Sequence, residues 1–260
     1  MPSLAGTVHA AVAANFTKVA EQLAADFKAA TGHEAVLSFG ATGALYTQIT
    51  QGAPFEVFFS ADDTRTATAI GDGFGVAGTD FTYAVGTLVL YSPTIDVTDG
   101  EAVLKGGAFQ HIAIADPTTA PYGAAGLVVL DGLGLASALS SKIVTGENIT
   151  QTLQFVESGS AELGFVALSQ VIGRPDTQVW RVPQDAYPAI RQNAVLLKAG
   201  EDNEAAKAFL EYVKSPEAVK VIEAAGYGEG QVAAVLALSR WNEAMVLGCP
   251  HLPKLDRPYS

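Results

Sequence analysis

A chain of 260 residues that is 49% hydrophobic and only 16% charged is long enough to bury a large core or to form two lobes, and this composition excludes a disordered protein. With 27 acidic and 15 basic residues the formal net charge is -12, and no run of Lys or Arg occurs, so nucleic acids and anionic membranes are poor partners. Cys249 is the single cysteine, which excludes an intrachain disulfide and a cysteine-based metal cluster.

Strands that run directly into helices characterise the first sixty residues. The sequence predicts a strand over 8–13 that leads into a helix capped by Asn15. A second strand, over 35–39, leads to a helix capped by Thr42, and a third ends just before Asp62. This alternation is typical of a parallel α/β sheet, whose ligands bind outside the carboxyl ends of the strands. We therefore expect Asn15 and Thr42 to face one crevice, while Asp62, which would repel an anion, caps its own helix.

The same pattern returns in a second lobe. A long apolar strand over 82–91 is expected to cross into that lobe, where a strand over 111–115 is followed by a helix that opens at Pro121. This start places Tyr122 at the mouth of the helix. A further helix is expected to be capped by Asn148, which makes Ile149 its first residue.

These elements divide the chain into four segments. We predict a first lobe over 1–83, a second lobe over 84–191, a return segment to the first lobe over 192–228 and a C-terminal tail over 229–260, a candidate extra helix. Because no apolar run reaches the roughly 18 residues of a membrane span, an integral membrane protein is not expected. The first residues carry no basic and apolar signal regions, so the chain is expected to be cytoplasmic or to be given without its leader.

Motifs for catalysis are missing from the sequence. There is no H-E-x-x-H, Walker A or G-x-S-x-G pattern, and a G-x-G-x-x-G match at 73–78 follows a helical stretch instead of a strand. The four histidines have no metal-ligand spacing; they are His9, His33, His111 and His251. We therefore predict recognition without a reaction, with no catalytic residue, no cofactor and no residue that ligates a metal cation directly.

Six short motifs are together similar to those of one known family. They are AANF at 13–16, SFGATG at 38–43, GAP at 52–54 with FFSAD at 58–62, APYG at 120–123, LGFVA at 163–167 and AAGY at 224–227. Over residues 7–228 the chain resembles the periplasmic molybdate-binding proteins of ABC importers, which are type II bacterial solute-binding proteins. Each motif alone would be a weak signal, whereas the set is specific.

This resemblance implies a fold, a ligand and a site. The fold is α/β with two lobes, each a mostly parallel sheet flanked by helices, joined by crossing strands and closing on a tetrahedral oxyanion. By resemblance, Asn15 and Thr42 bind molybdate or tungstate from the first lobe through side chain and backbone N–H groups. Tyr122 and the backbone N–H of Ile149 bind from the second. The resemblance also implies a periplasmic monomer that delivers its ligand to a membrane permease.

The chemistry of the oxyanions leaves some alternatives open. Molybdate and tungstate are fully deprotonated at neutral pH and only accept hydrogen bonds, so a neutral cleft rich in donors suits them. Sulfate has the same charge and shape, and its exclusion would depend on cavity size. A cytoplasmic oxyanion-sensing module of the same fold, or a binder of another oxyanion such as sulfate, is therefore the alternative. An enzyme on this fold is disfavoured because a nucleophile–base pair is missing.

Overall fold

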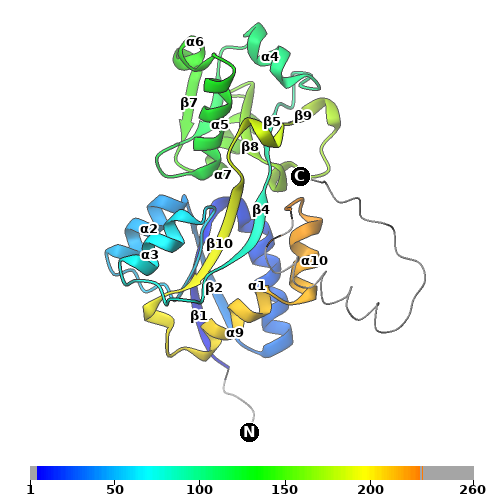
Figure 1. The fold of residues 1–260 in the computed structure, drawn as a ribbon. Coiled ribbons are helices and arrows are strands. Elements are labelled where there is room, and N and C mark those ends of the chain that lie inside the picture. Colours follow the sequence, from blue (N-terminus) through cyan, green and yellow to red (C-terminus); the bar gives the residue numbers. More distant parts are fainter. Residues whose placement is uncertain (1–4, 229, 231–260) are drawn as a thin grey trace, which may run out of the picture.

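The computed structural model describes residues 5–228 and 230, so the predicted tail over 229–260 lies, apart from Gly230, outside the described residues. Two α/β lobes are stacked end to end, and two long strands run along the axis between them (Figure 1). These strands are β4 (Phe81–Gly86) and β10 (Ile190–Leu196), which pair with each other in antiparallel register.

The first lobe is built on a five-stranded sheet with the order β2-β1-β3-β10-β4. Strands β1 (Thr7–Ala13), β2 (Glu34–Gly40) and β3 (Val57–Phe59) are parallel, whereas β10 is antiparallel to both of its neighbours. The helical segments of this lobe are η1 (Ala14–Phe16), α1 (Thr17–Thr31), α2 (Thr42–Thr50), α3 (Thr64–Gly71), η5 (Lys198–Gly200), α9 (Glu204–Val213) and α10 (Pro216–Ala224).

The second lobe repeats this plan with a sheet of order β7-β6-β8-β5-β9. Its strands are β5 (Leu88–Tyr91), β6 (Ile112–Ala115), β7 (Ile143–Gly146), β8 (Leu163–Ala167) and β9 (Val179–Arg181). Strand β5 is antiparallel to β8 and β9, and β6 is parallel to β7 and β8. Its helical segments are α4 (Gly100–Gly106), α5 (Pro121–Gly132), α6 (Ala136–Leu139), η2 (Ser140–Lys142), α7 (Ile149–Glu157), α8 (Leu168–Val171), η3 (Asp176–Gln178) and η4 (Gln184–Ala186).

Aromatic side chains pack against one another in the core of the first lobe, around the turn that follows β1. Phe16 is the last residue of η1, the turn that follows β1, and its ring centroid lies 4.7 Å from that of Tyr83 on β4 and 5.5 Å from that of Tyr227. All three residues are buried, and each buried aromatic ring of this kind stabilises the fold by about 1.5–3 kcal/mol relative to exposure. This packing fixes the turn between β1 and α1, where Asn15 lies.

The predicted two-lobed α/β architecture is confirmed, and the strand directions refine it. Both sheets are mixed, because one strand in each runs against its neighbours. The long strand predicted over 82–91 is two strands, β4 and β5, which belong to different sheets and are separated by Thr87. The predicted lobe boundaries at 83/84 and 191/192 fall inside β4 and β10, which are both strands of the first sheet.

Neither a single membrane-spanning helix nor a cluster of metal-ligating side chains occurs within residues 5–228 and 230. No single helix in this range is long and apolar enough to cross a membrane; α5 and the segment from Ala136 to Lys142 reach that length and apolarity only together, and they are bent by 118° relative to each other. Within the same residues, His, Cys, Asp and Glu side chains form no group that could hold a metal ion.

Candidate functional site: a neutral cleft between the lobes

A small cleft lies where the starts of several helices from the two lobes meet. The space within it that a water-sized sphere can occupy is only about 10 Å³, room for about one water molecule, and none of its eleven lining residues is charged. They are Ala13, Ala14, Asn15, Gly40, Ala41, Thr42, Ala61, Ala120, Pro121, Tyr122 and Ile149. The four residues predicted to bind the ligand are therefore brought together, two from each lobe.

Helix α7 offers a main-chain donor to this cleft. Asn148 caps the helix as predicted, and its Oδ1 accepts from the N–H groups of Thr150 and Gln151, each at 3.0 Å. The N–H of Thr152 donates to the carbonyl of Asn148. Ile149, the first helical residue, is the member of this turn whose N–H has no such partner among the described residues. Its N–H, at the positive end of the helix dipole, is free to donate to an anion.

Helix α2 begins one residue earlier than predicted, at Thr42 itself. The prediction that Thr42 is the N-cap is wrong: the N-cap is Ala41, and Thr42 is the first helical residue. Its hydroxyl oxygen accepts from the N–H of Ala61 at 3.0 Å, which ties α2 to the turn after β3. Because that bond uses the oxygen as an acceptor, the hydroxyl proton of Thr42 remains to be donated.

Asn15 is not a helix cap either, which corrects the sequence-based interpretation. It lies inside the 3₁₀ turn η1, and no side chain caps η1 or α1. Its side-chain Nδ2 instead donates to Oε1 of Gln192 at 2.8 Å and to the hydroxyl of Tyr227 at 3.0 Å. Both amide hydrogens are thus used inside the protein, so the donor that Asn15 has left for a ligand is its main-chain N–H.

Tyr122 reaches the cleft from the second residue of α5, a helix that begins at Pro121 as predicted. Its side chain is buried, and its hydroxyl accepts from Nε2 of Gln192 at 3.0 Å. Burial raises the pKa of Tyr122 well above its usual value, and the neighbouring Tyr227 and Tyr83 raise that pKa further. The phenol therefore keeps its proton at physiological pH.

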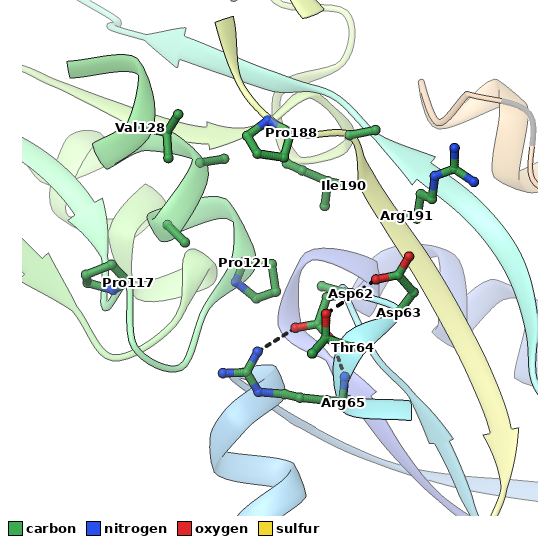
Figure 2. Close-up of a pocket in the computed structure, with 14 residues that line it drawn as sticks. Asp62, Asp63, Thr64, Arg65, Pro117, Pro121, Val128, Pro188, Ile190 and Arg191 are labelled. Atoms are coloured by element: carbon green, nitrogen blue, oxygen red, sulfur yellow. Dashed lines mark hydrogen bonds and ion pairs between the residues drawn. The ribbon is translucent and has the colours of Figure 1, made fainter. Parts of the chain in front are cut away.

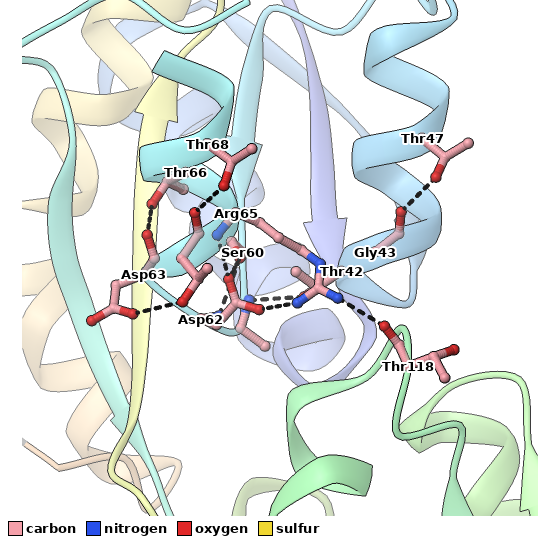
Figure 3. A network of polar contacts seen from close by, with 12 residues as sticks. Thr42, Gly43, Thr47, Ser60, Asp62, Asp63, Arg65, Thr66, Thr68 and Thr118 are labelled. Atoms are coloured by element: carbon pink, nitrogen blue, oxygen red, sulfur yellow. Dashed lines mark hydrogen bonds and ion pairs between the residues drawn. The ribbon is translucent and has the colours of Figure 1, made fainter. Parts of the chain in front are cut away.

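The two lobes touch on both sides of the cleft. On one side, Gly43 N–H donates to the carbonyl of Thr119 at 2.8 Å. Beside it, Arg65 Nη2 donates to the carbonyl of Thr118 at 2.8 Å, as Figure 3 shows. On the other, the hydroxyl of Thr150 donates to the carbonyl of Ala14 at 3.3 Å, and that of Ser169 to the carbonyl of Asn15 at 3.2 Å. These contacts describe a closed arrangement of the lobes.

Asp62 lies beside the cleft but does not line it. Its Oδ1 accepts from the main-chain N–H of Arg65 in the first turn of α3, and its Oδ2 forms an ion pair with the guanidinium of the same residue. Figure 2 shows this pair at the wall of a separate groove between α3, the start of α5 and β10. The N-cap of α3 is Asp63, one residue after the predicted cap Asp62, although the Asp62 carboxylate does accept from the first turn of its own helix, and Arg65 neutralises this carboxylate.

Comparison with known proteins identifies the family. The family model described as bacterial extracellular solute-binding protein matches residues 8–228, which span both lobes and the whole cleft. The chain belongs to this family. The match ends at the last residue before the tail.

Two relatives are named for molybdate binding. The chain is 52% identical to the molybdate-binding protein ModA of Rhodobacter capsulatus over 228 residues, which cover 87% of this chain and 90% of the relative. A solved structure of the Azotobacter vinelandii periplasmic molybdate-binding protein superposes with a TM-score of 0.82 at 41% identity, over 86% of this chain and all of that one. The sulfate-binding protein SubI of Mycobacterium tuberculosis, at 16% identity and a TM-score of 0.66, shares the fold alone.

Sequence reasoning missed the residue that connects the two halves of the cleft. Gln192, fully buried on β10, hydrogen bonds to both Asn15 and Tyr122. In the sequence it is the middle residue of a polar run, Arg191-Gln192-Asn193, at the start of the return strand, with no motif around it. Tyr227 belongs to the AAGY motif, yet its contact with Asn15 spans 212 positions and leaves no local signal.

Proposed function

We propose that this protein binds molybdate or tungstate in the cleft between its lobes and delivers it to the permease of an ABC transporter. The observation that carries the proposal is the neutral cleft in which helix starts from both lobes converge. The family assignment supports a solute-binding role, and two relatives named for molybdate binding support the choice of ligand. We also propose a periplasmic monomer that catalyses no reaction.

The dianion would be bound by hydrogen bonds and not by a positively charged side chain. Hydroxyls of Thr42 and Tyr122, together with the main-chain N–H groups of Asn15 and Ile149, form the proposed donor set. A charge-assisted hydrogen bond contributes about 1.5–3 kcal/mol, so a few such bonds in a small cleft can outweigh long-range repulsion from a screened net charge. The guanidinium of Arg65, which lies on α3 beside the cleft, is already paired with Asp62.

The lining residues also favour some oxyanions over others. Monohydrogen phosphate carries a proton that needs an acceptor, and no carboxylate lines the cleft. Molybdate, tungstate and sulfate carry no proton at neutral pH, so the lack of an acceptor in the cleft does not weaken their binding. Sulfate is the smaller ion, so its contacts with donors from two facing lobes would be longer. We therefore expect molybdate and tungstate to bind more tightly than sulfate, and phosphate to bind least.

Calorimetric titration of the purified protein with the four oxyanions tests this function. We expect saturable binding of molybdate and tungstate at a ratio of one ion per chain, and weak or no heat from sulfate and phosphate. Binding of sulfate alone would assign the protein to another oxyanion, and the absence of binding by all four would overturn the proposal. Separately, a transport assay with the permease would test delivery.

The affinity for molybdate is expected to be nearly independent of pH between about pH 6 and 9. No charged residue lines the cleft, and burial raises the pKa of Tyr122 well above its usual value, so this phenol keeps its proton across the range. Deprotonation would remove a donor and add a negative charge, which lowers affinity only at higher pH. Titrations across this range check the expectation, and a fall of affinity near neutral pH would contradict it.

A further inference from the structure

The cleft residues Asn15 and Tyr122 belong to a buried row of four polar side chains that are linked by hydrogen bonds. Tyr227, Asn15, Gln192 and Tyr122 follow one another through hydrogen bonds of 3.0, 2.8 and 3.0 Å. All four are buried; Gln192, on the strand that passes between the lobes, is 0% exposed. Tyr122 belongs to the second lobe and the other three to the first, so this hydrogen-bonded row crosses from one lobe to the other.

The donors and acceptors in this hydrogen-bonded row can be assigned starting from Tyr227. The hydroxyl of Tyr227 lies 2.8 Å from the main-chain carbonyl of Asn15, which can only accept, so the single proton of Tyr227 is used there. The side-chain atom of Asn15 at 3.0 Å from the same hydroxyl must then be a donor, which is Nδ2. The orientation of the Asn15 carboxamide is thereby fixed.

The fixed direction continues through Gln192 to Tyr122. The second hydrogen on Nδ2 of Asn15 goes to Oε1 of Gln192, and the hydroxyl of Tyr83 lies 3.0 Å from the same oxygen. With Oε1 turned toward Asn15, Nε2 of Gln192 donates to the hydroxyl oxygen of Tyr122. If Gln192 were reversed, its Oε1 would accept the proton of Tyr122, and the phenol could not donate it to a ligand.

The backbone leaves room for this contact. Gly86 ends β4, opposite Ile190 of β10, and a Cβ atom at this position would overlap the hydroxyl of Tyr122 and lie 2.8 Å from Nε2 of Gln192. A side chain at 86 would therefore separate the two groups. The hydroxyl of Tyr122 donates to no described residue, which leaves its proton for the cleft that it lines.

We propose that Gln192 is a positioning residue of the oxyanion site: by donating to the Tyr122 hydroxyl, it orients the phenolic O–H toward the bound ion. This inference rests on the proposed function. Gln192 does not line the cleft and would act on the ligand only through Tyr122. A purely structural role for Gln192 would make its effect on affinity independent of the Tyr122 hydroxyl.

A double-mutant cycle on the full chain, with molybdate as the probe, separates these two roles. Tyr122→Phe is expected to weaken binding roughly 10- to 100-fold, because a charge-assisted bond is lost, and Gln192→Met about 10-fold, because the hydroxyl is no longer oriented. In the Tyr122→Phe background, Gln192→Met is expected to change affinity by less than about 3-fold, since no hydroxyl is left to orient. Equal effects of Gln192→Met in both backgrounds would overturn the proposal.

One variant serves as a control for this experiment, and another can replace Gln192→Met. Thr82→Val removes the hydrogen bond from Thr82 to Asn193, which joins the same two strands at 2.8 Å without lining the cleft, and we expect it to leave affinity unchanged. Should Gln192→Met fail to fold, Tyr227→Phe replaces it, because it removes the group that fixes the direction of the hydrogen-bonded row. Its effect should likewise vanish in the Tyr122→Phe background. If the unmodified protein binds molybdate and the effects are additive, only this inference fails; if it binds none, the proposed function fails as well.

Discussion

Replacing Ile149 with proline is expected to weaken molybdate binding by roughly 10- to 100-fold while the ligand-free protein remains folded. Proline is well tolerated at the first position of a helix, and Asn148 before it is already extended, with φ of -153° and ψ of 174°. The substitution removes the one N–H of this turn that the Asn148 cap leaves free. Titration calorimetry gives the affinity, and thermal melting of the ligand-free variant shows whether the fold is kept.

Ile149→Val is the matched control for this variant. It also shortens a buried side chain, by one methylene group, but it keeps the N–H. Its affinity should stay within about 3-fold of that of the unmodified protein, at a stability cost of about 0.5–1.5 kcal/mol. Equal losses of affinity in the proline and valine variants would show that side-chain packing, and not the main-chain donor, determines binding.

Replacing Gly43 with valine is expected to prevent full closure of the lobes and to lower the affinity for molybdate by about 5- to 100-fold. A Cβ atom at this position would lie 3.0 Å from the Cα of Thr119 in the facing lobe and 3.2 Å from Nη2 of Arg65. Real Cβ atoms rarely approach backbone so closely, so the lobes must move apart. The hydrogen bond from Gly43 to Thr119 would then lengthen as well.

Small-angle X-ray scattering with and without molybdate measures this effect directly. The unmodified protein should give a smaller radius of gyration in the presence of ligand if closure accompanies binding, and Gly43→Val should show a reduced change. Ala44→Val provides the control, because Ala44 is the next residue of α2 and is exposed. Unchanged affinity and unchanged compaction in Gly43→Val would show that this contact is not needed for closure.

The parts of the site that depend on residues close together in the sequence could be predicted from it. Asn148 caps a helix through bonds to residues two and three positions away, so its pattern is visible locally, and Ile149 follows from it. Pro121 at the start of α5 is equally local. The alternation of strands and helices likewise predicted two α/β lobes.

Other features depend on distant contacts and could not be predicted in this way. Asn15 stands where a cap is expected, but its side chain is engaged by Gln192 and Tyr227, which lie 177 and 212 positions away. The short turn η1 separates β1 from α1 and moves the start of the helix past Asn15. Strand direction is also invisible in an apolar run, so the antiparallel placement of β10 and β5 was not predicted.

The position of β10 has a consequence for how the chain can fold during synthesis. In the first sheet β10 lies between β3 and β4, so these two earlier strands have no direct pairing with each other. The first lobe cannot complete its sheet until residues 190–196 have left the ribosome, and until then β3 exposes an unpaired edge. The strands of the second lobe, in contrast, come from one continuous stretch, 88–181. The second lobe can therefore assemble first, and β10, the last strand among the described residues, then closes the lobe that was begun first.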